Sequence, residues 1–241
     1  MSLALKLALS PLLIAQAMAT RRRAPVLPEA AGPRQGRLGQ GGGALRLLIA
    51  GDSSAAGVGV AHQDQALAGH LTRELCRRTS RPVHWTLHAR SGLTTQQVHA
   101  LLRAQARSPA EVAVVLTGVN DVIDQIPSGR AVLHREALAD WLLAECGVTH
   151  VLFAPLPPVH RFPLLPQPLR RVMGDDARRH DDALARWAAT RSDVSHIAIA
   201  LDLTPDAMAS DGFHPGEPVY RVCGEALAAH ITTLTFKETT A

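Results

Sequence analysis

The chain has 241 residues, of which 46% are hydrophobic and 19% charged, so it can bury the core of one domain and still carry extra segments. Its formal net charge is +4, yet only 3% of the residues are aromatic and most of the arginines are scattered along the sequence. Proteins that bind nucleic acids concentrate basic residues on one surface and often stack bases on aromatic rings, so this composition argues against that class. The three cysteines, Cys76, Cys146 and Cys223, form no CxxC pair, and there is no HExxH motif, so we expect neither a disulfide framework nor a metal site.

The N-terminal segment, residues 3–19, is almost entirely apolar and is followed at once by Arg21–Arg23. As a membrane-spanning helix it would be roughly 26 Å long, slightly short for a hydrocarbon core of ~30 Å, and Pro11 would kink it. As a signal peptide it has Lys6, an apolar run and a small-residue cleavage site, but arginines directly after that site disfavour export. A helix that packs on its own domain or lies in a membrane interface is the third interpretation. We expect residues 1–23 to be associated with a membrane, with the domain on the cytoplasmic side; export is the alternative.

Residues 24–43 read as a linker. Proline, glycine, arginine and glutamine dominate this segment, and it shows no hydrophobic period. We therefore expect the folded domain to begin at Ala44 and to extend to residue 237.

Short apolar runs alternate with longer helical patterns over the rest of the chain. The predicted strands are Leu45–Ala50, Val83–Ala89, Val112–Leu116, His150–Ala154 and His196–Leu201. The predicted helices are Gln65–Arg78, Thr95–Arg107, Arg130–Cys146, Leu169–Thr190 and about Glu217–Thr233. This alternation predicts a parallel five-stranded sheet covered by helices on both faces, that is, a three-layer α/β/α sandwich.

Polar residues follow three of these strands at the point where each strand ends. The first strand runs into "GDSS" with Ser53, the second into "ARSGLTT" with Gly92, and the third into "TGVNDV" with Asn120. The carboxyl ends of parallel strands meet at one edge of a sheet, where α/β proteins bind their ligands, so these loops should converge. A fourth cluster, "SDGFHPG" with Asp211 and His214, would join them if its connection folds back over the sheet.

Together these residues could supply the parts of a nucleophilic acyl transfer. Ser53 is a candidate nucleophile, His214 a candidate base and Asp211 a residue that could orient the base. The unshielded backbone N–H of Gly92 and the side-chain amide of Asn120 are candidate donors to an oxyanion. Each also has a purely structural interpretation, as a helix cap, a turn glycine or a helix-start residue. A phosphate-binding loop is disfavoured because neither GxxxxGK[ST] nor GxGxxG is present.

Two further carboxylates, Asp52 and Asp121, stand at strand ends beside these candidates. We expect them to accept hydrogen bonds from loop N–H groups and to hold the loops in place rather than to react.

In their order along the chain, "GDSSAAGVG", "SGLTT", "GVND" and "DGFHP" resemble the four sequence blocks of the SGNH hydrolases, also called GDSL-type esterases and lipases. The resemblance spans about Leu45 to Ala229. It implies the flavodoxin-like sandwich of that family. Ser54 stands where the family name has leucine, and alignment on "GDS" selects Ser53 rather than Ser54 as the reactive serine.

The resemblance also implies the role of each residue. Ser53 would be the nucleophile, His214 the base and Asp211 the group that fixes the imidazole tautomer. The backbone N–H groups of Ser53 and Gly92, with the Asn120 amide, would form the oxyanion hole. The implied activity is hydrolysis of a small-molecule or lipid ester through an acyl-enzyme, with no metal or organic cofactor. An acyltransferase on the same fold and a non-catalytic small-anion binding module are the alternatives.

A proline-rich loop, Pro155–Arg171, follows the fourth predicted strand and is expected to be extended and stiff. If it walls the active site, it offers three apolar side chains for an acyl chain, Phe162, Leu164 and Leu165, and three cations for an anion, Arg161, Arg170 and Arg171. Alternatively it is only a structural connection that packs on its own domain.

Overall fold

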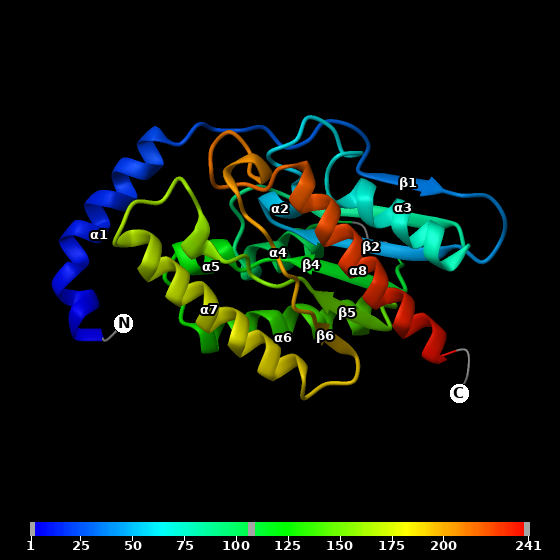
Figure 1. Cartoon of the computed structure of the whole chain (residues 1–241). Coiled ribbons are helices and arrows are strands. Elements are labelled where there is room, and N and C mark those ends of the chain that lie inside the picture. The colour runs from blue at the N-terminus through cyan, green and yellow to red at the C-terminus, as the bar shows by residue number, and fades with distance from the viewer. Residues whose placement is uncertain (1–2, 106–108, 239–241) are drawn as a thin grey trace.

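The computed structural model describes residues 3–105 and 109–238, and its centre is a single sheet (Figure 1). The six strands lie in the order β1-β3-β2-β4-β5-β6. They are β1 (Gln35–Leu38), β2 (Leu45–Gly51), β3 (Val83–Ala89), β4 (Val112–Leu116), β5 (His150–Phe153) and β6 (Val194–His196). Strands β2 to β6 pair in parallel, and β1 pairs antiparallel to β3. This arrangement confirms the predicted α/β architecture.

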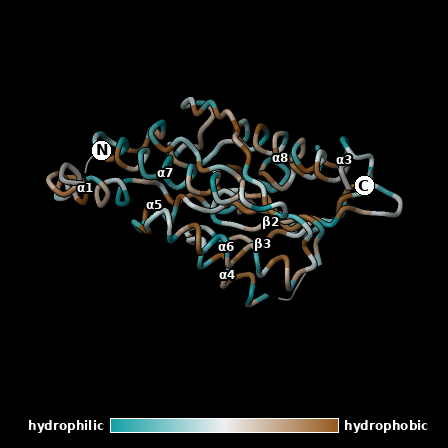
Figure 2. The backbone as a smooth tube through the Cα atoms, turned by 90° about the horizontal axis from the view of Figure 1, so that it is seen from below, coloured by the Kyte–Doolittle hydropathy of each residue, from teal (hydrophilic) through white to brown (hydrophobic). Residues whose placement is uncertain are grey.

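Helices cover both faces of the sheet and make three layers (Figure 2). One face is covered by α3 (Leu67–Thr79) and α8 (Glu217–Glu238), and the other by α4 (Thr95–Ala104), α6 (Ser128–Glu145) and α7 (Leu169–Ala188). Short helices lie in the connections: α2 (Ser53–Ala56), α5 (Val119–Ile123), η1 (Val159–Arg161) and η2 (Pro205–Ala207). The helix α1 (Leu3–Arg23) precedes the domain.

The central strands β2, β4 and β5 are mostly apolar because both of their faces are buried; the exceptions are Arg46, which is exposed, and His150 at the start of β5. In β2, Leu47 and Ile49 pack toward α3 and α8, whereas Leu48 and Ala50 pack toward α4, α6 and α7. Successive residues of a strand point to opposite faces, so one continuous apolar run fills both cores. The carboxyl ends of these strands are thereby held together at one edge.

The strand count differs from the prediction because of β1. The sequence predicted five strands and no regular element in residues 24–43, but Gln35–Leu38 adds a sixth strand beside β3. All four residues of β1 are exposed, so this edge strand has no hydrophobic pattern by which the sequence could have revealed it. The sheet therefore begins before Ala44.

The last strand is also shorter and earlier than expected. The prediction placed it at His196–Leu201, whereas β6 is Val194–His196 and pairs only with Val151–Phe153 of β5. Ile197 and Ile199 continue past the end of the ladder and pack, partly buried, against the core under α3 and α8. The apolar residues at positions 197 and 199 therefore reflect packing against the core and not pairing in a strand. The predicted end of another helix, at Arg107, lies outside the described residues, and α4 ends at Ala104.

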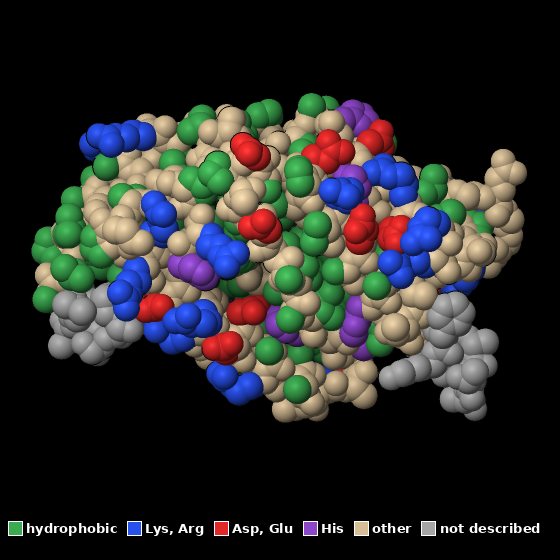
Figure 3. Space-filling model, in the orientation of Figure 1, with side chains coloured by type: hydrophobic (Ala, Val, Ile, Leu, Met, Phe, Trp, Pro, Cys, Tyr) green, Lys and Arg blue, Asp and Glu red, His purple; other side chains and the backbone are tan. Residues whose placement is uncertain are grey.

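The helix α1 packs one side against the domain. Leu13 contacts the core on the α7 side, and the Gln16 side chain donates to the carbonyl of Gln167 (2.7 Å) and accepts from the N–H of Leu169 (3.1 Å). Over residues 3–105 and 109–238, no helix is long and apolar enough to cross a membrane. Hydrophobic side chains of α1 nevertheless remain exposed over the helix (Figure 3), namely Leu7, Leu12, Ile14 and Met18.

Candidate active site

Ser53 is the first residue of α2, directly beyond the end of β2. Asp52 caps this helix by accepting a hydrogen bond from the N–H of Ser54 (3.0 Å). A Cβ at Gly51 would lie 2.2 Å from the carbonyl oxygen of Leu116, so only glycine lets β2 approach β4 at this point. The close approach places Ser53 at the sheet edge, beside the loop that follows β4.

His214 is held by Asp211, three residues earlier. Its Nδ1 lies 2.6 Å from Asp211 Oδ2, and the backbone N–H groups of Phe213 and His214 donate to Asp211 Oδ1, both at 2.9 Å. Burial alone would raise the pKa of Asp211, but these hydrogen bonds outweigh it and hold the pKa below its ordinary value. An ionised Asp211 fixes the ring through Nδ1, which leaves Nε2 as the free ring nitrogen.

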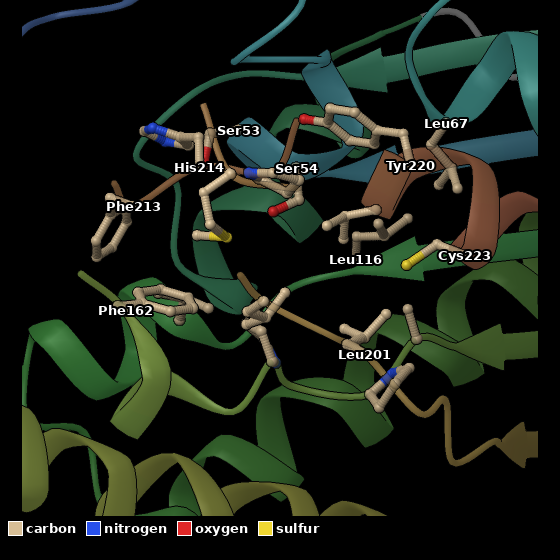
Figure 4. Close-up of a pocket in the computed structure, with 18 of the residues that line it drawn as sticks. Ser53, Ser54, Leu67, Leu116, Phe162, Leu201, Phe213, His214, Tyr220 and Cys223 are labelled. Atoms are coloured by element: carbon tan, nitrogen blue, oxygen red, sulfur yellow. The ribbon is translucent and has the colours of Figure 1, made fainter. Parts of the chain in front are cut away.

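Two contacts bring the Ser53 segment and the His214 segment together, although they are far apart in the sequence. At Gly59, with φ +107°, a Cβ would lie 2.2 Å from the carbonyl oxygen of Pro215, so the glycine permits close approach of the histidine loop. Tyr220 of α8 donates its hydroxyl to the carbonyl of Val58 (2.7 Å). Ser53 and His214 lie next to each other on one pocket (Figure 4).

Asn120 and Gly92 lie on the same pocket as Ser53 and His214. Asn120 is in α5 and donates from Nδ2 to the carbonyl of Leu93 (3.0 Å), which ties its loop to the Gly92 loop. Its second Nδ2 contact, to Asp52 Oδ2, is 3.4 Å long and therefore weak. Gly92 is exposed with φ +81°, a conformation that L side chains rarely adopt. The structure thus brings all four predicted segments together at one site.

Asp121 links the Asn120 loop to the Gly92 loop, as the sequence predicted for a strand-end carboxylate. It accepts hydrogen bonds from the N–H (2.9 Å) and the hydroxyl (2.5 Å) of Thr95. It also pairs at 3.6 Å with Arg135 of α6, and both side chains are fully buried. Arg135 in turn donates to the carbonyl of Thr117 (3.4 Å), just before Asn120.

The sequence reasoning did not identify Arg135. A signal was present, because Arg135 lies in phase with Ala131, Leu138 and Leu142, which form the buried face of α6. An arginine within an apolar stripe calls for a buried acid, and a strand-end aspartate such as Asp121 is a natural partner.

Asp52 is buried beside the candidate nucleophile, and its ionisation is perturbed. Burial raises its pKa to about 7, although the N–H of Ser54 and the nearby His214 both act to lower it. The carboxyl group therefore changes charge near neutral pH, within hydrogen-bonding reach of Asn120.

The pocket has a volume of about 260 Å³ and is mainly apolar beyond Ser53 and His214. The proline-rich loop contributes Pro155, Pro157 and Phe162 to its wall. Leu165 is instead buried in the core, and the N–H of Leu164 donates to the carbonyl of Gly212. Six side chains of this loop were predicted to contact the substrate, and only Phe162 lines the pocket. The five that do not line it are Leu164, Leu165, Arg161, Arg170 and Arg171.

Within the described part of the chain, no three His, Cys, Asp or Glu side chains come together in a way that could hold a metal ion.

The sequence matches the family described as GDSL-like Lipase/Acylhydrolase over residues 49–222. It is 26% identical over 193 residues to a GDSL-like esterase of Mycobacterium tuberculosis, in a match that covers 76% of this chain. The chain covers 60% of that relative, which is less than two thirds of its length.

Solved structures of a lipolytic protein and of an esterase share the fold. A lipolytic protein of the G-D-S-L family from Veillonella parvula is similar with a TM-score of 0.59 and 15% identity, covering 76% of this chain and 97% of its own. An inhibitor-bound aryl esterase of M. smegmatis is similar with a TM-score of 0.56 and 19% identity, covering 79% of this chain and 100% of its own.

The raised pKa of Asp52 predicts a pH-dependent stability. An unfolded aspartate loses its proton near pH 3.8, whereas folded Asp52 keeps its proton up to about pH 7, so this group favours folding at low pH and that contribution falls as pH rises between these values. The free energy of unfolding of the wild type relative to Asp52→Asn should therefore decrease over this window, by at most about 4 kcal/mol. Urea denaturation at a series of pH values measures the difference.

The exposed Asp206 provides the control, because an Asp206→Asn curve should run parallel to that of the wild type. If the Asp52→Asn curve is also parallel to the wild type, Asp52 does not titrate in this range.

Proposed function

The chain belongs to the GDSL-like lipase/acylhydrolase family, and from that membership and the geometry of the site we propose that it is a serine ester hydrolase. The family match confirms the resemblance to the SGNH, or GDSL-type, hydrolases. The observation that carries the proposal is the 2.6 Å contact between His214 Nδ1 and Asp211 Oδ2, on the pocket that Ser53 also lines.

In the proposed reaction, the Ser53 hydroxyl oxygen attacks the carbonyl carbon of the ester while His214 Nε2 takes its proton. The tetrahedral intermediate collapses, the bond to the alkoxy oxygen breaks, and His214 returns the proton to the leaving alcohol. Water then attacks the acyl-enzyme with His214 again as base, and the carboxylic acid leaves as Ser53 regains its proton. Asp211 stabilises the imidazolium, consistent with its lowered pKa.

The developing negative charge on the carbonyl oxygen would be met by the backbone N–H groups of Ser53 and Gly92 and by the Asn120 amide. One Asn120 hydrogen holds the carbonyl of Leu93, and the other faces Asp52 at 3.4 Å. That long contact is readily exchanged for a bond to the substrate. Asn120 would therefore orient itself with one hydrogen and stabilise the oxyanion with the other.

The shape of the pocket supports an ester with an acyl chain of medium length. Val219, Tyr220 and Cys223 lie on one side of α8, and Cys223 is four residues, or about 6 Å, farther from the helix start than Val219. At the end of the pocket away from Ser53, Cys223 lies with Leu67 of α3 and Leu201 (Figure 4). A cavity of about 260 Å³ holds roughly nine non-hydrogen atoms if each takes the ~30 Å³ that a water molecule occupies in the liquid. The 16-carbon palmitoyl chain would therefore not fit inside.

The activity is tested with p-nitrophenyl esters from acetyl to palmitoyl, comparing the full-length wild type with Ser53→Ala. We expect the wild type to hydrolyse them with an optimum at medium chain length, and Ser53→Ala to lose nearly all of this activity because the proposed acyl-enzyme forms on the Ser53 hydroxyl. A folded wild type that cleaves none of the esters would favour the binding-module alternative. Activity that survives in Ser53→Ala would show that Ser53 is not the nucleophile.

Chain-length selectivity is tested at the far end of the pocket. Cys223→Leu fills part of that end, so the optimum should move to shorter acyl chains while the acetyl ester is cleaved at the wild-type rate. Cys76→Leu on α3 is the matched control, since Cys76 does not line the pocket and its substitution should leave the optimum unchanged. An equal loss for every chain length in Cys223→Leu would contradict this position for the acyl chain.

We also propose that α1 lies on a membrane surface, with the domain on the cytoplasmic side. The exposed Leu7, Ile14 and Met18 would enter the lipid interface, and the exposed Arg21–Arg23 at the end of the helix would meet anionic headgroups (Figure 3). Export across the membrane is the alternative location.

Binding to a membrane is tested by co-sedimentation with vesicles that contain anionic lipid. Ile14→Glu should reduce binding severalfold because it places a charge in the apolar interface, whereas Leu133→Glu, at an equally exposed leucine of α6, should not. Equal binding by both variants and the wild type would contradict the role of α1. Digestion of the domain by protease added to intact cells would show that it is exported.

A further inference from the structure

An acid from outside the family match contacts the loop that carries Gly92. Glu29 precedes β1, and its Oε1 accepts a hydrogen bond of 2.7 Å from the backbone N–H of Ser91. The family match begins only at residue 49. The residue next to a proposed oxyanion donor is therefore held by a segment that the match does not include.

Arg34 holds the Glu29 side chain in place. Its Nη2 lies 2.5 Å from Glu29 Oε2, and its Nη1 donates to the carbonyl of Ala89 (2.7 Å), the last residue of β3. The pair thus contacts the chain on both sides of Arg90, at Ala89 and at Ser91. Hydrogen bonds in which a partner is ionised are stronger than neutral ones and fix geometry more tightly.

The backbone around Glu29 is itself anchored beside the nucleophile. The N–H of Ala30 donates to the carbonyl of Ala56 (3.2 Å), and Gln63 donates from Nε2 to the carbonyls of both Ala30 (3.2 Å) and Ala56 (3.0 Å). Ala30 and Gln63 are buried. Glu29 therefore projects from a fixed backbone and not from a free linker.

Gly92 has little to hold it except its neighbours. It is exposed, and a Cβ there would meet no atom within 4 Å. The loop is fixed by flanking hydrogen bonds, from Arg90 N–H to the Gly51 carbonyl (3.2 Å) and from Asn120 Nδ2 to the Leu93 carbonyl (3.0 Å). The hydrogen bond from the Ser91 N–H to Glu29 adds a further restraint, at the residue adjacent to Gly92.

We propose that Glu29 is a positioning residue for the reaction, which sets the orientation of the Gly92 N–H through its hydrogen bond to Ser91. The inference rests on the proposed function, because it assigns Gly92 to the oxyanion hole. Misplacing such a donor weakens an interaction made mainly in the transition state, so the loss should fall on kcat and not on KM.

The competing explanation is that Glu29 only tethers the N-terminal segment to the domain. A tether would change the melting temperature without a selective change in kcat. The two explanations are separated by a variant that keeps the acceptor oxygen, since Glu29→Gln can still accept from the Ser91 N–H while it loses the ion pair with Arg34.

The test uses full-length Glu29→Ala and Glu29→Gln, assayed below their melting transitions on the best ester of the wild type. Glu29→Ala should lower kcat roughly 10- to 100-fold with KM unchanged, and its Ser91 amide should exchange hydrogen faster. Glu29→Gln should restore most of kcat. Glu74→Ala removes a comparable glutamate that pairs with Arg77 and Arg78 on α3, and should leave kcat unchanged.

Wild-type kcat in Glu29→Ala, or a loss that Glu29→Gln shares in full, overturns the proposal. Ser53→Ala in the same assay keeps the two questions apart. If Ser53→Ala is as active as the wild type, the proposed function fails, whatever the Glu29 variants do. If Ser53→Ala is inactive while Glu29→Ala is fully active, only the role of Glu29 fails.

Discussion

The site depends on the hydrogen bonds around Gly51, where three parallel strands end together. The carbonyl of Gly51 accepts from Arg90, at the start of the Gly92 loop, and the next N–H, that of Asp52, donates to Leu116 at the end of β4. A side chain at residue 51 would collide with the Leu116 carbonyl. One glycine thus fixes the Ser53 segment relative to both loops that, on the proposed mechanism, would stabilise the oxyanion.

Buried charge keeps these loops in register. The Asp121–Arg135 pair is fully buried, and the hydrogen bonds from Thr95 to Asp121 and from Arg135 to Thr117 offset part of its cost of desolvation, although Arg135 Nε and Nη1 have no hydrogen-bond partner in the described part of the chain. Among the residues that the structure describes, no cation lies within hydrogen-bonding distance of Asp52, and burial raises its pKa to about 7. Beneath the Gly92 and Asn120 loops, one carboxyl group is thus paired with a cation, whereas the other changes charge near neutral pH.

Much of the fold and most of the candidate site could be predicted from the sequence, because continuous apolar runs mark the central strands and polar residues mark their ends. The edge strand β1 could not, since "QGRL" is exposed along its length and owes its structure to pairing with β3. Glu29 left no signal either, because a single acid in a segment rich in proline and glycine gains meaning only from Ser91, which the fold brings next to it.

Helix α8 contacts both the Ser53 segment and the far end of the pocket. Tyr220 holds Val58, and with it the Ser53 segment, while Cys223, one turn farther along, lies at the far end of the pocket. The position of the helix follows from its contact with α3, where a Cβ at Gly224 would lie 2.8 Å from the Cβ of His70. A change at this helix crossing would therefore alter the pocket length and the placement of the nucleophile together. On the proposed mechanism, selectivity for the acyl chain and the rate of its transfer are set by the same packing contact.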